Sequence, residues 1–258
     1  MYVSKEFLDI IKPLDSNWSM GVELASPFIY SVIRLVRPRS VLEIGAGYSS
    51  AFILQAIADN LEDFRRESEV MQTQSQADQQ DRLQWFKNKV LHGRHPFPLA
   101  LREYYDVPYE PMLTIIDNMS HSSGTAGQVQ KVANRLGLNH LLHFQQGDFR
   151  GMSKAFREKT LPLDFVWFDC GAYEQYRAFL EEYWNLIEPN GGLLLLHSTL
   201  TNFQLRSIVL DLKLKQATDH FNKFEMLSLL EPHKWRQNSV TLIRMLPKDG
   251  EKIYTAEP

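Results

Sequence analysis

The sequence predicts an α/β protein with a mostly parallel central sheet and helices on both of its faces. Two observations support this prediction. Short apolar segments alternate along the chain with apolar stripes at helical spacing, and one segment, Leu193 to Leu196, is an uninterrupted apolar run. Such a run is typical of a strand that is covered on both faces, and strands that alternate with helices form parallel sheets through right-handed crossovers.

The first strand is expected at Ser40 to Gly45, after a helical stripe that begins at Leu24. Ser49 is suited to cap the helix that follows this strand. The remaining strands are short apolar or β-branched runs, expected at Leu113 to Asp117, Leu141 to Gln145, Leu163 to Asp169, Leu193 to Leu196, Phe224 to Leu230 and Val240 to Met245. The last two runs are close enough in sequence to pair as an antiparallel hairpin.

Two further helices are expected between these strands. Val129, Val132 and Leu136 form an apolar stripe that ends at a glycine, and a second stripe runs from Tyr176 to Ile187. Each stripe would place one apolar face of a helix against the sheet.

Residues of about 60–111 interrupt this alternation, because the connection between the first two strands is longer than a helix and a loop require. This polar, glutamine-rich stretch agrees with two interpretations. One is a solvated helical excursion with a flexible middle, and the other is a lid or an oligomerisation arm. We therefore expect one domain over residues 1–258, with an N-terminal helical segment at 1–38 and a helical insertion at about 60–111.

Composition excludes several classes of protein. The chain has 28 Lys and Arg against 31 Asp and Glu, so no net basic field favours nucleic acid or an anionic membrane. No apolar run approaches the length of a membrane span. The single cysteine, Cys170, excludes an internal disulfide and suits a reducing compartment, and residues 1–18 lack the pattern of a secretory signal. We expect a cytoplasmic protein without a membrane or nucleic-acid partner.

The turn after the first strand is the first candidate binding site. Gly45 and Gly47 allow the backbone to approach a ligand closely, and the helix that begins near Ser49 offers amides to an anionic group. A dinucleotide site would need a third glycine where Ser50 stands. Asp117 ends a strand and is suited to accept hydrogen bonds from a ribose diol.

Five landmarks together carry a resemblance. They are Val41 to Gly47, the strand-ending Asp117, Gly147 to Phe149, Asp164 to Asp169, and Pro189 to Leu196. In this order the landmarks resemble those of the class I S-adenosylmethionine-dependent methyltransferases, from about Trp18 to Met245. The resemblance implies a Rossmann-like methyltransferase fold, with a seven-stranded, mostly parallel sheet whose last strand is antiparallel.

The same resemblance assigns roles to individual residues and implies S-adenosylmethionine as cofactor. Glu43, Gly45, Gly47 and Ser49, with the adjacent Tyr48, would frame the methionine part of this cofactor. Asp117 with Asn118 would hold the ribose, and Asp148 with Phe149 the adenine. Asp169 would lie beside the methionine part of the cofactor and its methyl group.

Within the class, the Gly47-Tyr48-Ser49 triplet and the Phe168-Asp169 pair look most like the catechol-type small-molecule O-methyltransferases. That subgroup binds a divalent metal through a carboxylate matched by Asp169 and through an Asp-Asn pair. Here the pair is His197-Ser198, and a lysine of the subgroup is replaced by Ala172. Because magnesium prefers several oxygen ligands, we predict no obligatory metal, although a softer metal at Asp169 and His197 stays open.

His197 becomes the candidate general base, because an imidazole titrates near neutral pH. The alternative is a histidine that bonds a loop carbonyl and has only a structural role. The loop from Pro232 to Gln237 is close enough to the site to reach the acceptor, unless it is a solvated hairpin tip.

The predicted function is methyl transfer to a small-molecule O or N nucleophile, with His197 and Asp169 as catalytic residues. Two alternatives belong to other classes: a Rossmann oxidoreductase that binds NAD, and a non-catalytic cofactor-binding scaffold whose interaction surface would be the insertion. The family and the long insertion also suggest a homodimer.

Overall fold

The computed structural model describes residues 3–15, 21–77, 102–121, 124–158, 162–218 and 223–247. Its strands are β1 (Ser40–Ile44), β2 (Met112–Asp117), β3 (Leu142–Gln146), β4 (Phe165–Phe168), β5 (Leu193–His197), β6 (Phe224–Leu230) and β7 (Ser239–Met245). Its α-helices are α1 (Lys5–Ile11), α2 (Ala25–Val36), α3 (Tyr48–Ala77), α5 (Arg102–Tyr105), α6 (Ala126–Arg135), α7 (Ser153–Glu158), α8 (Tyr173–Tyr183) and α9 (Phe203–Thr218). Short 3₁₀ turns are η1 (Lys12–Leu14), η2 (Asn139–Leu141) and η3 (Trp184–Leu186).

The strands form one seven-stranded sheet in the order β3-β2-β1-β4-β5-β7-β6. Strands β1 to β5 pair in parallel, and β7 pairs antiparallel with both β5 and β6. This arrangement confirms the predicted Rossmann-like methyltransferase fold and the antiparallel hairpin. The chain moves outward from β1 to β3 and then returns to place β4 on the other side of β1, so the sheet has its topological switch point between β1 and β4.

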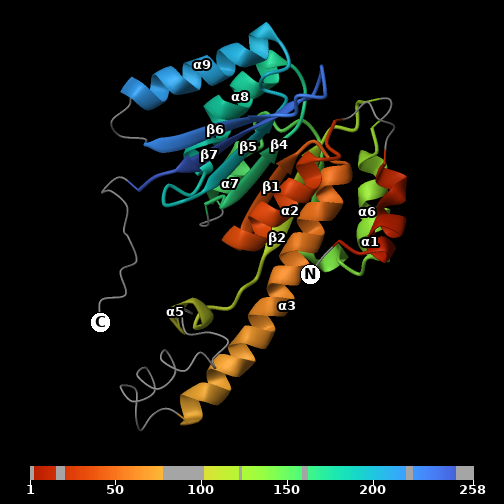
Figure 1. Ribbon diagram of the computed structural model, residues 1–258, viewed down its shortest axis with the longest axis vertical. Coiled ribbons are helices and arrows are strands. Elements are labelled where there is room, and N and C mark those ends of the chain that lie inside the picture. Colours follow the sequence, from red (N-terminus) through yellow and green to blue (C-terminus); the bar gives the residue numbers. More distant parts are fainter. Residues whose placement is uncertain are drawn as a thin grey trace. The chain divides into compact units, whose positions relative to one another are not determined.

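Helices cover both faces of the sheet, as Figure 1 shows: α8 and α9 lie on one face, and α1, α2 and α6 lie on the other. The central strands β1, β2, β4 and β5 are mostly buried; Leu194 and Leu196 of β5, for example, are fully inaccessible to solvent. This double cover explains the uninterrupted apolar run of β5, since neither face of that strand meets water.

Helix α8 follows the predicted apolar stripe. Tyr176, Phe179 and Tyr183 lie one turn apart and are all buried against the sheet. The Phe179 ring lies 4.5 Å from the Phe168 ring of β4 and stacks on Tyr183 at 5.0 Å between ring centroids. Aromatic packing therefore fixes α8 directly behind the carboxyl end of β4.

The chain divides into two compact units, residues 1–57 with 111–258 and residues 58–110. Helix α3 starts in the first unit and continues to Ala77. In the second unit, the Phe64 ring packs on Tyr104, Tyr105 and Tyr109, with centroids 5.5 to 5.8 Å apart. Most of the glutamine-rich and proline-rich stretch, with Trp18 and Met20, lies outside the described residues.

None of the helices in the described ranges has the length and hydropathy needed to cross a lipid bilayer.

Candidate functional site

The turn between β1 and α3 is closely packed against the end of β4. Gly45 has a φ of +94°, and a Cβ at this position would lie 2.2 Å from the carbonyl oxygen of Asp169. The backbone N–H of Gly45 donates to Ile116 O at 3.0 Å, and that of Asp169 donates to Ile44 O at 2.9 Å. The ends of β1, β2 and β4 are thus held together, and only glycine fits at position 45.

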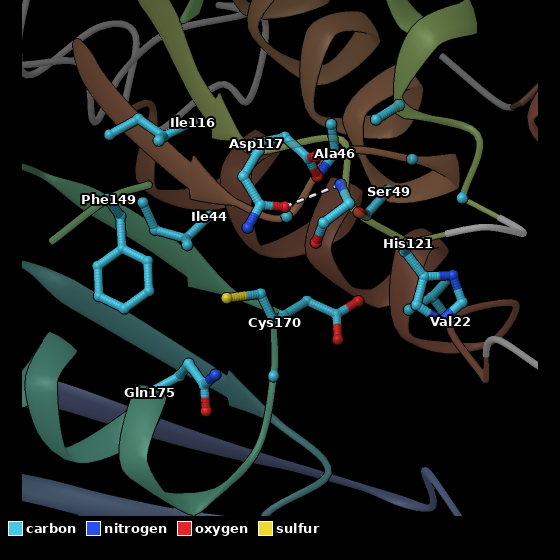
Figure 2. Close-up of a pocket in the computed structure, with 18 of the residues that line it drawn as sticks. Val22, Ile44, Ala46, Ser49, Ile116, Asp117, His121, Phe149, Cys170 and Gln175 are labelled. Atoms are coloured by element: carbon cyan, nitrogen blue, oxygen red, sulfur yellow. Dashed lines mark hydrogen bonds between the residues drawn. The ribbon is translucent and has the colours of Figure 1, made fainter. Parts of the chain in front are cut away.

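Asp117 supports the same turn from the end of β2. Its Oδ2 accepts a hydrogen bond from the Ala46 N–H at 2.8 Å, visible in Figure 2, and its Oδ1 accepts one from the Met119 N–H at 2.5 Å. The next side chain, Asn118, accepts a bond from the Ser120 N–H at 3.0 Å. Because a carboxylate has about four lone-pair positions, Asp117 retains acceptor capacity for a ligand hydroxyl.

Glu43 lies beneath the turn, with no exposed surface. Ser49 Oγ donates to its Oε1 at 2.6 Å, while Oε2 has no partner in the described part of the chain. Burial raises the pKa of the Glu43 carboxyl to about 8, although the nearby hydroxyl groups of Ser49 and Ser50 lower it. Glu43 is therefore a mostly protonated structural group at neutral pH.

A cavity of about 830 Å³ opens at the carboxyl ends of the parallel strands. It brings together nine residues that the sequence analysis singled out: Gly45, Gly47, Tyr48, Ser49, Asp117, Asn118, Asp148, Phe149 and Asp169. The two others, Glu43 and His197, lie behind its wall and do not line it. In the view of Figure 2, Phe149 stands at one end of the cavity, and His121 and Val22 stand at the other.

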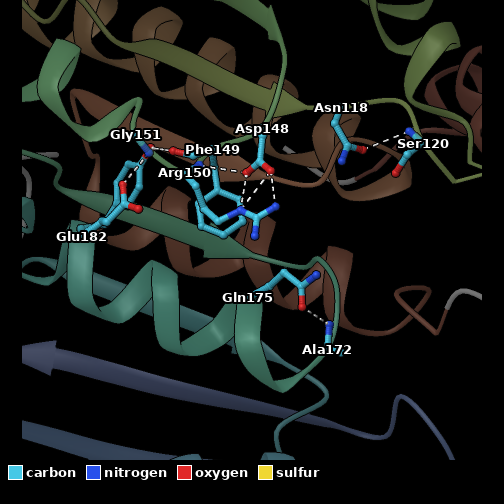
Figure 3. Close-up of polar contacts among 10 residues, drawn as sticks. Asn118, Ser120, Asp148, Phe149, Arg150, Gly151, Ala172, Gln175 and Glu182 are labelled. Atoms are coloured by element: carbon cyan, nitrogen blue, oxygen red, sulfur yellow. Dashed lines mark hydrogen bonds and ion pairs between the residues drawn. The ribbon is translucent and has the colours of Figure 1, made fainter.

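The Phe149 end of the cavity combines an apolar ring with a charged rim. The Phe149 side chain is buried, and its carbonyl oxygen accepts a hydrogen bond from the Tyr183 hydroxyl at 2.7 Å. Arg150 Nε donates to both carboxylate oxygens of Asp148 at 3.0 Å, a pairing shown in Figure 3. These hydrogen bonds from Arg150 are the main reason why the pKa of Asp148 is lowered.

Asp169 and His197 form a pair at the centre of the site. His197 Nδ1 lies 2.7 Å from Asp169 Oδ1, and the side chains are 1% and 28% exposed, respectively. The carboxylate thus faces the cavity while the imidazole lies behind it, with its ring 5.5 Å from that of Trp167. Burial, the largest influence, lowers the pKa of His197, but the nearby carboxylates of Asp169 and Glu231 outweigh it, so that the pKa is raised.

The donor set around Asp169 does not fit a magnesium site. The nearest ring nitrogen of His197 is at hydrogen-bond distance from Asp169 and occupies one of its oxygens. In the described part of the chain, no three His, Cys, Asp or Glu side chains are grouped to hold a metal ion. Magnesium favours several oxygen ligands, which this pair does not supply.

Cys170, next to Asp169, lines the cavity as well. Burial raises the pKa of its thiol to about 12, and the neighbouring carboxylate of Asp169 raises it further. The thiol is therefore protonated at neutral pH and suited to packing rather than nucleophilic attack.

The loop between β6 and β7 supplies part of the cavity wall through Arg236 and Gln237, which confirms that it reaches the site. Sequence reasoning missed other lining residues, among them Arg150, Gln175, Thr201 and Asn202. Thr201 and Asn202 could have been found from their position directly after β5, where side chains of a parallel sheet gather.

Comparisons with known proteins agree with this geometry. A family model described as a methyltransferase domain matches residues 42–199, more than half of the chain. A search of curated proteins finds no match.

Among solved structures, the O-methyltransferase TomG from Streptomyces achromogenes, in complex with SAM, has a TM-score of 0.57 and 12% identity over 94% of this chain and 90% of its own. An O-methyltransferase from Bacillus cereus in complex with SAH scores 0.55, with 13% identity over 93% and 89%. An rRNA methylase from Streptococcus thermophilus scores 0.50, with 10% identity over 89% and 98%.

At these identities the structural matches establish a shared fold, and the fold serves more than one kind of acceptor. The family match extends from β1 through β5 and includes the glycine turn, Asp117 and Asp169. The chain belongs to this family of methyltransferase domains.

Proposed function

We propose that this protein is a metal-independent methyltransferase that transfers the methyl group of S-adenosylmethionine to an oxygen or nitrogen of a small molecule. The observation that carries the proposal is the cavity at the switch point of the sheet, where a carboxylate, Asp169, faces inward and is backed by a buried histidine, His197. A wholly apolar pocket would have no group to receive the acceptor's proton.

The cavity has the features that an adenosyl cofactor needs. Gly45 and Gly47 line it, and a Cβ at Gly45 would clash with the backbone of Asp169, directly after β4. Asp117 has acceptor capacity for the ribose hydroxyls, and Phe149 offers an apolar surface for the adenine. The volume of about 830 Å³ lies within the range of cofactor and small-molecule sites.

The remaining residues of the turn would complete the cofactor site. Tyr48 and Ser49 begin α3 and line the cavity beside Gly47, where they would hold the methionine part. Asn118 and Asp148 would border the ribose and the adenine. Glu43 would act indirectly, because its contact with Ser49 supports the turn from below.

When bound, S-adenosylmethionine supplies an electrophilic methyl group on a positively charged sulfur. The residues of this chain then have two tasks: they align the acceptor and they receive its proton. Alignment is worth up to roughly 7 to 11 kcal/mol, and a positioned base adds roughly a 10²- to 10⁴-fold acceleration.

Asp169 is the group that would contact the acceptor, because it lines the cavity and His197 does not. The proton released by an acceptor hydroxyl or ammonium would pass to the carboxylate. His197 would share that proton through the 2.7 Å contact and keep the carboxylate oriented. The proposed base is thus the pair, with Asp169 in contact with the acceptor and His197 behind it.

A small molecule is the proposed acceptor for two reasons. The net charge of −3 offers no attraction to a polyanion such as RNA, and the cavity volume of about 830 Å³ lies within the range of small-molecule sites. TomG and the Bacillus cereus protein are O-methyltransferases by their names, which favours an oxygen acceptor.

The test combines binding and turnover. Calorimetry with S-adenosylhomocysteine should show one site per chain, and transfer of a radiolabelled methyl group should be measured against a panel of phenols, acids and amines in the presence of EDTA. Asp169→Asn and His197→Ala should each lower turnover by about 10²-fold or more. Neither variant should change the affinity for S-adenosylhomocysteine by more than a few fold.

His143→Ala is the matched control, because His143 is an exposed histidine on β3 that does not line the cavity. It should retain full turnover. Unchanged turnover in both active-site variants would remove the pair from the mechanism, and a complete loss of activity in EDTA that magnesium restores would overturn metal independence.

A further inference from the structure

One part of the cavity lining is formed by residues that lie outside the proposed cofactor site. Ser198, Thr201 and Asn202 follow β5, and Arg236 and Gln237 belong to the loop between β6 and β7. None of them comes from the glycine turn or from the ends of β2 and β3, where the proposed cofactor site lies. We call this wall, formed by Ser198, Thr201, Asn202, Arg236 and Gln237, the acceptor wall.

Several contacts hold the loop of the acceptor wall in place. Lys234 Nζ donates to Gly21 O and Glu23 Oε2 at 3.1 Å and lies 2.8 Å from Glu231 Oε2. The backbone N–H of Gln237 donates to Thr201 Oγ1 at 3.1 Å. These contacts join the loop to residues 21–23 on one side and to the segment after β5 on the other, so Arg236 is carried by an anchored loop.

Charge distinguishes the two arginines that line the cavity. The positive charge of Arg150 is neutralised by the carboxylate of Asp148, both of whose oxygens accept hydrogen bonds from Arg150. Arg236, by contrast, makes no ion pair with any described residue, and its guanidinium lies 4.1 Å from the centroid of the Trp235 ring. Trp235 itself is 78% exposed, so its ring supports Arg236 without being part of a core.

Stacking on an aromatic ring uses the face of a guanidinium and leaves its N–H edge available. That edge matches the two oxygens of a carboxylate in a bidentate pair, a geometry that lysine cannot reproduce. An arginine that lies over an aromatic ring in the wall of a binding cavity, with no ion-pair partner among the described residues, is therefore prepared for an anionic partner.

We propose that Arg236 selects acceptors that carry a carboxylate group. This inference rests on the proposed methyltransferase function and adds the chemical class of its acceptor: an acid whose carboxylate binds Arg236 while its hydroxyl or amine is directed toward Asp169. Trp235 is the positioning residue, because its ring lies against the guanidinium.

The test uses paired probes that differ only in charge. Hydroxybenzoic and hydroxycinnamic acids, each with its primary amide, are titrated calorimetrically into protein saturated with S-adenosylhomocysteine. Wild-type protein should bind the best acid roughly ten-fold or more tightly than its amide, as expected for a charge-assisted hydrogen bond. This preference should disappear in Arg236→Gln and fall partway in Arg236→Lys and Trp235→Ala.

Two controls separate this inference from other effects. Lys213→Gln removes one positive charge from the exposed surface of α9, outside the cavity, and should leave the preference unchanged. Affinity for S-adenosylhomocysteine should be the same in all variants, so a failure of wild-type protein to bind it would count against the proposed function instead.

Three results would each overturn the inference. Wild-type protein could bind acid and amide with equal affinity, the preference for the acid could survive in Arg236→Gln, or Lys213→Gln could lose that preference as fully as Arg236→Gln. Binding of none of the acids by wild-type protein that holds S-adenosylhomocysteine would overturn it as well.

Discussion

Gly45 is the single residue on which the geometry of the site depends most directly. Its φ of +94° and the 2.2 Å approach of Asp169 O to an added Cβ mean that alanine has no allowed position there. Gly45→Ala should therefore push the β1 turn away from Asp169. We expect a loss of roughly 1 to 3 kcal/mol in the free energy of unfolding and at least a ten-fold weaker affinity for S-adenosylhomocysteine, measured by denaturation and calorimetry.

Gly137 provides the matched control for this substitution. It also has a positive φ, +71°, but no atom lies within 4 Å of an added Cβ. Gly137→Ala should cost stability through the backbone alone and leave ligand affinity intact. Equal loss of affinity in both variants would show that the close approach at Gly45 has no special role.

Glu43 should make stability depend on pH. Its pKa rises from an ordinary value of 4.5 to about 8 in the folded protein because it is buried. Between these values the unfolded chain releases the proton that the folded chain retains, so the free energy of unfolding falls as pH rises, by at most about 1.4 kcal/mol per pH unit. Below pH 4.5 the contribution of Glu43 to the free energy of unfolding is fully present, and above pH 8 this contribution falls no further.

Glu43→Gln, a neutral side chain of the same shape, should flatten this part of the profile. Urea denaturation of both proteins at intervals from pH 4.5 to 8.5 measures the difference directly. The exposed Glu174→Gln should follow wild type. Parallel curves for Glu43→Gln and wild type would show that the buried carboxyl does not retain its proton.

For individual residues, the sequence predicts which ones line the cavity better than it predicts how their side chains are oriented. Gly45, Asp117 and Asp169 follow strands, and the topology of a parallel sheet brings such positions together. His197 also ends a strand, yet it is buried and meets Asp169 through the wall of the cavity. Its orientation depends on packing against Trp167 of the neighbouring strand, which spacing along the chain does not reveal.

Helix α8 connects the packing of the molecule to both ends of the site. Tyr176 donates its hydroxyl to the carbonyl of His197, and Tyr183, two turns on, donates to the carbonyl of Phe149 at 2.7 Å. Both tyrosines are buried. One face of helix α8 thus fixes two stretches of backbone. One is at His197, in the proposed catalytic pair with Asp169, and the other is at Phe149, where the adenine is proposed to bind.

Removing each hydroxyl should separate these two effects. Tyr176→Phe and Tyr183→Phe each leave one buried carbonyl without its partner, which should cost roughly 1 to 3 kcal/mol of stability. Tyr183→Phe should mainly weaken S-adenosylhomocysteine binding, whereas Tyr176→Phe should mainly lower turnover. Calorimetry and methyl-transfer rates distinguish the outcomes, and identical changes in both assays would mean that α8 acts only through general stability.

The elements themselves differ in how readily the sequence predicts them. All seven strands occur within about two residues of their expected positions, because each is a short apolar run between turn residues. Helix α9 has no counterpart in the sequence analysis. Its apolar residues occur around the whole helix, with Leu210 and Leu214 exposed as well as Leu212 buried, so no stripe marks one face.

At the scale of the whole molecule, the insertion forms a compact unit of its own. The second unit, residues 58–110, has boundaries close to the insertion predicted at about 60–111. It contains its own aromatic cluster around Phe64, and Tyr105 Oη donates to Glu67 at 3.0 Å. The described residues that line the cavity all belong to the first unit. We therefore propose that the insertion is dispensable for cofactor binding.

Two phenylalanines on the same helix test this proposal. Phe64 of α3 is buried in the second unit, and Phe52 of α3 is buried in the first, where its ring packs on Phe7 at 5.2 Å. Replacing either ring by alanine should remove roughly 3 to 5 kcal/mol of local packing. Phe64→Ala should lose hydrogen-exchange protection over residues 102–110 while it binds S-adenosylhomocysteine within two-fold of wild type. Phe52→Ala should lower both the melting temperature and that affinity, and a ten-fold weaker affinity in Phe64→Ala would instead make the insertion part of the binding site.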